Sequence, residues 1–128
     1  MATETAQPSS VPSQVDIVTD FLDAVAEGDL ERISYLVSPG VDWSYVDKVD
    51  GDHHSATGLS QFRTFLRGDN LERNTTIVCA VPLRRFVIVS EHVRGTDGRA
   101  REREGAYEVR DNVITSAWIT DHEAANRS

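Results

Sequence analysis

The most constraining feature of the sequence is its second half, where strand patterns follow one another with no helical pattern between them. Each segment combines β-branched or aromatic residues with period-two alternation, over residues 75–81, 85–94, 101–109 and 113–120. Short turns join them, such as Gly95-Thr-Asp-Gly98 and Arg110-Asp-Asn112. Strands joined by short turns pair antiparallel, so this half of the chain predicts an antiparallel sheet.

Helical patterns are confined to the first half of the chain. Apolar residues recur there at spacings of three and four in three segments, 15–25, 30–37 and 59–66. Ser13 and Asp16 have the spacing of a capping box, Gly28 can end the first helix, and Asp29 can cap the second. Helices gathered ahead of the sheet pack on one of its faces, which is an α+β arrangement.

One more strand is expected between the second and third helices. Residues 41–47 alternate large and polar side chains and place Trp43, Tyr45 and Asp47 on one face. The polar stretch that follows, with His53 and His54, predicts a loop. Adjacent histidines on a loop rarely converge on one ion, so we expect no metal, and we expect no cofactor.

The length of 128 residues allows one domain. Residues 1–13 are rich in Ser, Thr, Pro and Gln, which predicts a disordered tail. We place the domain at 14–122 and a second tail at 123–128.

Charge and hydropathy exclude several partners and locations. The net charge of -8 repels phosphate backbones and anionic lipids, so we expect neither nucleic acid nor membrane as a partner. The basic stretch 99–103 is interleaved with Glu102 and Glu104 and predicts a solvated, self-compensating strand face. Residues 1–10 lack the pattern of a secretory signal and no segment is apolar enough to span a bilayer, which favours a cytoplasmic protein. The single cysteine, Cys79, is expected in the core.

Two stretches carry a resemblance to a known family. The segments FLDAVAEGDL, starting at Phe21, and LVSPGVDW, ending at Trp43, together with the order of elements, resemble the nuclear-transport-factor-2-like superfamily over about 13–122. Thr57-Gly58 and the spacing of Ile114 and Trp118 look like its SnoaL-like polyketide cyclase branch. The resemblance implies a cone-shaped, cystatin-like α+β barrel, with three helices on a curved, mostly antiparallel sheet and one pocket for a small, largely apolar molecule.

Ketosteroid isomerases, limonene epoxide hydrolases and SnoaL-like cyclases of this superfamily act on hydrophobic substrates with carboxylates placed in the cone. The isomerase pattern does not carry over, because its tyrosine falls on Phe21 and its protonated aspartate falls near Gly105. The residues of the epoxide hydrolase pattern fall on Trp43 and Tyr45, on His92 and Arg94, which are two residues apart in one strand, and on the region 119–121. This comparison implies that His92 and Arg94 point into the cone.

Four residues are candidates for catalysis: Tyr45, Asp47, His92 and Asp121. His92 could exchange a proton near neutral pH, and Asp121 could orient it if it faces the cone. The alternatives are that His92 is a hydrogen-bonded structural residue and that Asp121 ends the last strand in solvent. Periodicity does not choose between the faces of the last strand, nor between those of the strand 86–94, which are both apolar.

The residues expected to line the pocket are Phe21, Trp43, Phe62, Ile88, Ser90, Arg94, Tyr107 and Trp118. Our leading hypothesis is an enzyme of secondary metabolism that cyclises, isomerises or opens an epoxide in a small hydrophobic metabolite. The rivals are a binding protein for a small apolar ligand and a dimerisation module with a filled cone. We also expect a homodimer, because Val87, Val89 and Val93 offer a second apolar face.

Overall fold

The computed structural model describes residues 13–48, 51–68, 74–94 and 100–123. The elements in chain order are α1 (Gln14–Glu27), α2 (Leu30–Leu36), β1 (Val37–Asp47), β2 (Asp52–Thr57), α3 (Leu59–Gly68), β3 (Asn74–Leu83), β4 (Phe86–Arg94), β5 (Ala100–Arg110) and β6 (Val113–Glu123). The predicted tails, 1–13 and 123–128, lie outside the described residues except for Ser13, which caps α1, and Glu123, which ends β6. The predicted turn at 95–98 also lies outside them.

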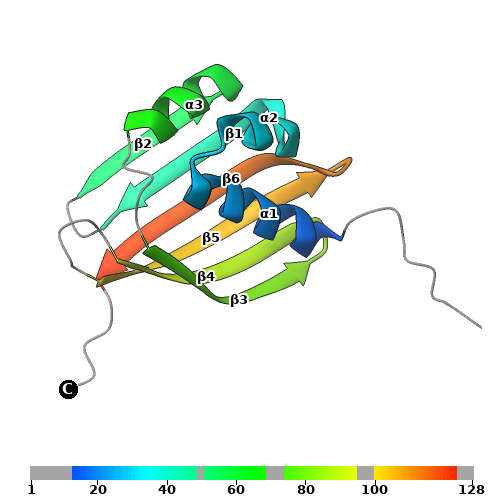
Figure 1. The fold of residues 1–128 in the computed structure, drawn as a ribbon. Coiled ribbons are helices and arrows are strands. Elements are labelled where there is room, and N and C mark those ends of the chain that lie inside the picture. Colours follow the sequence, from blue (N-terminus) through cyan, green and yellow to red (C-terminus); the bar gives the residue numbers. More distant parts are fainter. Residues whose placement is uncertain (1–12, 49–50, 69–73, 95–99, 124–128) are drawn as a thin grey trace, which may run out of the picture.

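The strands form one six-stranded sheet in the order β2-β1-β6-β5-β4-β3. Every neighbouring pair is antiparallel except β1 and β6, which run parallel. The sheet is curved and the three helices lie on one face, with α1 over β3 to β6 and α3 over β1 and β2 (Figure 1). We call this covered face the inner face and the opposite one the outer face. The predicted α+β class and cone-like layering are confirmed.

The helix boundaries follow the predicted signals. The Ser13 side chain accepts a hydrogen bond from the Asp16 backbone N–H, and the Asp16 carboxylate accepts one from the Ser13 N–H, which completes the capping box. Gly28 ends α1 in the left-handed conformation, with φ of 70°. The side chain of Asp29 then accepts from the Arg32 N–H at the start of α2.

Strands β1 and β2 differ most from the expectation. The predicted loop around His53 and His54 is the edge strand β2, which pairs antiparallel with β1. Its pattern was invisible because Ala56 is the only buried residue of the strand. Strand β1 also begins earlier, at Val37, and carries Pro39 through a register shift between Val37 and Asp42. An irregularity of this kind is where a strand tolerates proline.

The middle of the inner face holds an aromatic cluster of four buried rings: Phe21, Trp43, Phe62 and Tyr107. Phe21 of α1 contacts the other three, with ring centroids 5.9–6.3 Å apart. Trp43 and Phe62 lie closer, at 4.7 Å. The cluster therefore joins α1 and α3 to β1 and β5. Polar residues lie next to it, toward one end of the strands.

Candidate functional site

Four charged side chains lie in register across the inner face, near one end of the strands. Strand pairing aligns Asp47 of β1 with Asp121 of β6. It also aligns Asp121 with Arg103 of β5, and Arg103 with Glu91 of β4. The three carboxylate residues are buried, with exposed fractions of 5% for Asp47, 1% for Asp121 and 3% for Glu91. We call these four residues the charged row.

Asp121 is the most densely bonded member of the charged row. The Arg103 guanidinium donates to it twice, from Nε to Oδ1 at 2.6 Å and from Nη2 to Oδ2 at 2.9 Å. The Tyr45 hydroxyl donates to Oδ2 at 2.7 Å. The Tyr45 ring also makes two further contacts. The Arg103 guanidinium lies over it, 5.7 Å from its centroid, and the His54 ring stacks on it with the centroids 6.0 Å apart. This bidentate, charge-assisted arrangement fixes the geometry of all three groups.

A second ion pair lies at the edge of the site. Arg101, two residues before Arg103 on β5, donates from Nη1 to the Oδ2 atom of Asp47 at 2.9 Å. To do so it reaches from β5 across β6 to β1, because β6 separates those two strands in the sheet. The charge of Arg101 also acts on Asp121. The basic stretch of β5 is therefore not a solvated face: Arg101 and Arg103 both neutralise buried carboxylates, which corrects the expectation.

Glu91 differs from the other two carboxylates because the described part of the chain offers it no direct partner. Among the described residues, no hydrogen bond or ion pair reaches its carboxylate. Burial raises the pKa of Glu91 above its ordinary value; the charge of Arg103 opposes the rise, and that of Asp121 adds to it. Glu91 therefore keeps its proton to a higher pH than an exposed glutamate does.

The pKa of Asp121 moves in the opposite direction. Burial alone would raise it, but the hydrogen bonds and charge of Arg103, with the Tyr45 hydrogen bond, hold the pKa of Asp121 below its usual range. Burial and the neighbouring Asp121 raise the pKa of the Tyr45 hydroxyl, so this phenol stays protonated. Two carboxyls separated by one arginine are thus pushed apart in pKa, a pattern that marks acid and base roles.

The structure brings together three of the four predicted catalytic residues. Tyr45, Asp47 and Asp121 lie within the polar end of the inner face, and their catalytic roles stay predictions. His92 does not join them. It follows Glu91 on β4 and is exposed on the outer face, so the predicted dyad of His92 with Asp121 is wrong.

The same alternation corrects several residues expected to line the pocket. Ile88, Ser90, Arg94 and Trp118 all lie on the outer face, whereas Phe21, Trp43, Phe62 and Tyr107 are buried in the aromatic cluster. Val87, Val89 and Val93, expected to face a partner, are all buried on the inner face, and the first two belong to the hydrophobic core. Both faces of β4 are apolar, so the sequence pattern had two solutions, and the structure takes the one with Glu91 inside. Cys79, expected in the core, is exposed.

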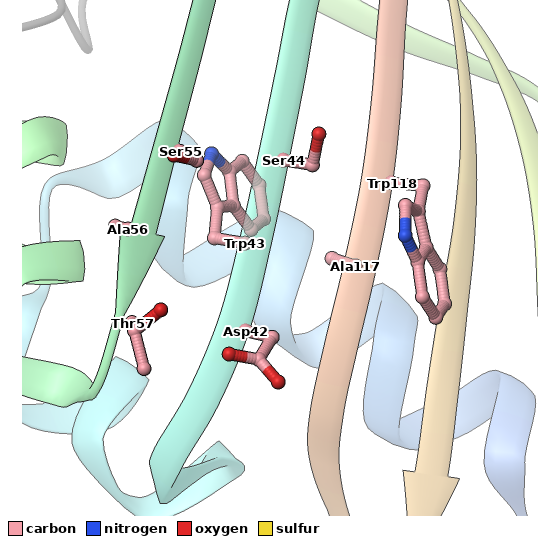
Figure 2. A pocket seen from close by; sticks show the side chains of 8 residues that line it. All are labelled: Asp42, Trp43, Ser44, Ser55, Ala56, Thr57, Ala117 and Trp118. Atoms are coloured by element: carbon pink, nitrogen blue, oxygen red, sulfur yellow. The ribbon is translucent and has the colours of Figure 1, made fainter.

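The outer face carries a shallow groove of about 170 Å³ over β2, β1 and β6 (Figure 2). Its outward side chains are Asp42, Ser44, Ser55, Thr57 and Trp118. Trp118 is 48% exposed and its ring lies 6.1 Å from that of Phe86. The groove lies on the opposite side of the sheet from the charged row, so the two are separate features.

Sequence reasoning missed Glu91 and Arg103 as members of the site. The alternation of the strand 86–94 puts Glu91 on the same face as three valines, and the interleaved charges around Arg103 are typical of a solvated surface. The signal that could have found them is register: an arginine on β5 stands directly opposite an acidic residue on each neighbouring strand.

Within the described residues there is no group of three or more His, Cys, Asp or Glu side chains that could hold a metal ion. No helix of the described parts of the chain is long and apolar enough to cross a membrane. The cytoplasmic location stays a prediction, as does the absence of a cofactor or a nucleic-acid partner.

No family model and no curated protein matches the chain. Solved structures do match it. IdmH, a proposed polyketide cyclase from Streptomyces antibioticus, has a TM-score of 0.69 and 19% identity, covering 86% of this chain and 92% of IdmH. An LEH-like epoxide hydrolase from M. tuberculosis has a TM-score of 0.70 and 16% identity, covering 85% of this chain and 82% of that protein.

A third similar structure, from Catenulispora acidiphila, has a ketosteroid isomerase-like fold and was solved in complex with trimethylamine. Its TM-score is 0.66 and its identity 20%, covering 90% of this chain and 88% of that one. Other matches are NTF2-like proteins of unknown function. The chain thus has the nuclear-transport-factor-2-like fold, a fold that includes isomerase, cyclase and epoxide hydrolase members, and the predicted resemblance is confirmed at that level.

Proposed function

We propose that the protein is an enzyme that moves a proton within a small, largely apolar molecule, with Glu91 as the group that carries the proton. The observation behind this proposal is the environment of Glu91, a buried carboxyl with a raised pKa and no direct partner among the described residues. An acid or base works best when its pKa lies near the working pH. Burial moves Glu91 in that direction.

The neighbouring groups supply a fixed polar wall. Arg103 is held by two hydrogen bonds to Asp121, and Tyr45 is held by one, so none of the three must reorganise during a reaction. Asp121 already accepts three hydrogen bonds and has a lowered pKa, which makes it a weak base. We therefore assign Asp121 to positioning and Glu91 to proton transfer.

The reaction that best fits a single mobile proton is the isomerisation of an unsaturated ketone, or a ring closure of the same type. Ionised Glu91 takes a proton from a carbon beside the carbonyl, and the electron pair of the broken C–H bond enters the shifting double bond. The same carboxyl then returns the proton to another carbon. Atoms balance without any further reagent, and the fixed dipoles stabilise the charge that develops on the oxygen.

Epoxide opening is the second candidate. The observation that favours it is the difference in pKa between the two carboxyls. A neutral Glu91 could protonate the epoxide oxygen as its C–O bond breaks, while ionised Asp121 takes the proton that the attacking water loses as the new C–O bond forms. The three hydrogen bonds on Asp121 make this reaction less favourable than proton transfer by Glu91 alone.

The test compares Glu91→Gln with the matched variant His92→Gln on the same strand. Two probes separate the reactions: 3-cyclohexenone, whose isomerisation is followed by ultraviolet absorbance, and cyclohexene oxide. We expect Glu91→Gln to lower kcat/KM by ~10²–10⁴, because positioned acid–base catalysis is lost. His92→Gln should leave kcat/KM unchanged, since His92 is exposed on the outer face. Glu91→Gln at the wild-type rate, or a wild-type protein that converts neither probe, would contradict the proposal.

We also propose that two copies pair through the outer face. This replaces the expected valine face with Trp118, Ile88, Val81 and Leu83, which are large apolar residues exposed there. Charge does not oppose the contact locally, because Glu108 on this face is paired with Arg85 and Arg110. Hydrogen bonds from Thr115 and Arg85 lower the pKa of Glu108 to about 2, so these pairs persist at neutral pH. Sedimentation should give a dimer at micromolar concentration and a monomer for Trp118→Glu; a wild-type monomer would remove the inference.

A further inference from the structure

The Tyr107 ring packs closely over Gly105, and the proposed proton transfer by Glu91 does not use either residue. Both residues lie on the inner face of β5, two positions apart. Arg103 lies on the same face, two positions before Gly105. A Cβ atom added to Gly105 would lie 2.8 Å from Cε1 and 3.2 Å from Cζ of the Tyr107 ring. These two atoms belong to the hydroxyl end of the ring, so that end lies directly over Gly105.

This position sets the direction of the Tyr107 hydroxyl. The ring starts at position 107, in the aromatic cluster, and its far end reaches position 105. The hydroxyl, one bond beyond Cζ, therefore points along β5 toward Arg103 and the charged row. A side chain at position 105 would exclude the Tyr107 ring, because its Cβ would lie 2.8 Å from the ring atom Cε1. The same Cβ would also lie 2.8 Å from the Ile119 Cδ1 atom, so it could not move away from the ring on that side. Glycine at this position is what admits the phenol.

Among the described residues, the hydroxyl of the buried Tyr107 side chain has no hydrogen-bond partner. The residue is 1% exposed, and no other described residue hydrogen-bonds to it. A buried phenol normally finds a hydrogen-bond partner, and an exception calls for an explanation. Burial, with the charge of Glu91, raises the pKa of Tyr107, so the group is a donor at any ordinary pH.

We propose that Tyr107 is a substrate-binding donor, whose hydroxyl binds a neutral acceptor oxygen placed between the aromatic cluster and the charged row. The proposal deepens the proposed function and rests on it for the position of the reacting group. It names the ligand class as an uncharged, mostly apolar molecule with one carbonyl or ether oxygen. A charged ligand fits less well, because Arg103 with Asp121 and Arg101 with Asp47 already form neutral pairs.

The test uses cyclohexanone, an unreactive probe with one acceptor oxygen, so that it does not depend on turnover. Binding is measured by NMR titration for the wild-type protein and for Tyr107→Phe, which keeps the ring and removes only the hydroxyl. Tyr35→Phe is the matched control, since Tyr35 is exposed. We expect Tyr107→Phe to weaken binding roughly 5- to 10-fold, as loss of one hydrogen bond does. Tyr35→Phe should bind as the wild type.

A second measurement separates hydrogen bonding from packing. The carbonyl stretch of bound cyclohexanone should lie at lower frequency in the wild type than in Tyr107→Phe. Equal affinity and equal frequency in the two proteins would overturn the proposal, as would a wild-type protein that does not bind the probe. If Glu91→Gln keeps full turnover while Tyr107→Phe loses binding, the proposed function fails and the assignment of Tyr107 stands. If Glu91→Gln loses turnover while Tyr107→Phe binds the probe as the wild type does, the binding role of Tyr107 fails and the proposed function stands.

Discussion

The aromatic cluster and the charged row share the inner face of the same sheet, yet they are stabilised by different physical effects. The cluster consists of four buried rings in mutual contact, where burial itself is favourable. The three carboxylate residues of the charged row are as deeply buried, and there burial is unfavourable unless each charge is paired. Asp47 and Asp121 meet that requirement through arginines, whereas Glu91 meets it by holding its proton to higher pH.

This difference supports the proposed role of the charged row in proton transfer. A core could be built from apolar residues throughout, and replacing buried ion pairs with apolar residues is often neutral or stabilising in other proteins. Retaining three buried carboxylates at one end of the sheet is therefore not explained by folding. A site that must hold a proton ready for transfer does explain it.

Removing a ring from the aromatic cluster should have the largest effect on stability. Phe21→Ala deletes the residue that contacts the other three rings, and such substitutions typically cost about 3–5 kcal/mol of unfolding free energy. Because no charge is involved, the loss should be the same across pH. Chemical denaturation of Phe21→Ala and of the exposed control Tyr35→Ala measures it. A loss below 1 kcal/mol would show that the cluster is not the main core.

Breaking the charged row should cost less and should depend on pH. Asp121→Asn leaves the Arg103 guanidinium without its carboxylate, for which we expect a loss of about 3 kcal/mol at neutral pH. The pKa of Asp121 is lower in the folded than in the unfolded protein, so its contribution is present above the unfolded pKa and disappears as pH falls through the folded pKa. The difference between wild type and Asp121→Asn should therefore vanish in acid. A difference that stays constant with pH would mean that Asp121 acts through packing alone.

The two regions also differ in how far the sequence predicted them. The burial of Phe21, Trp43 and Phe62 follows from helical and strand periodicity. Each belongs to a run of large side chains that recur on one face of its element, and that face is the buried one. The caps at Ser13 and Asp29 follow from local chemistry in the same way.

The charged row required information that a single strand does not contain. Arg103 alternates with acidic residues and looks like a surface charge until β5 is placed between β4 and β6. Only then do Glu91 and Asp121 stand opposite it. On β4 the presence of apolar residues on both faces left the orientation open, and the error in placing His92 follows from that ambiguity. Long-range pairing of charges, rather than local pattern, decided which face was buried.

The most direct test of this account is the titration of the Glu91 side chain in the folded protein. Carbon-13 NMR of the glutamate and aspartate side-chain carboxyl carbons gives a midpoint for each residue. Glu91→Gln and Asp121→Asn identify the Glu91 and Asp121 signals by their loss. The account predicts a midpoint for Glu91 well above the ordinary glutamate pKa of about 4.3, with Asp121 titrating below its own ordinary value. Because the folded state would then bind the proton more tightly than the unfolded state, raising the pH through this range should lower the stability of the wild type more than that of Glu91→Gln. A Glu91 midpoint at or below about 4.3 would mean that the carboxylate is ionised and satisfied like its neighbours, and would contradict its role as the proton carrier.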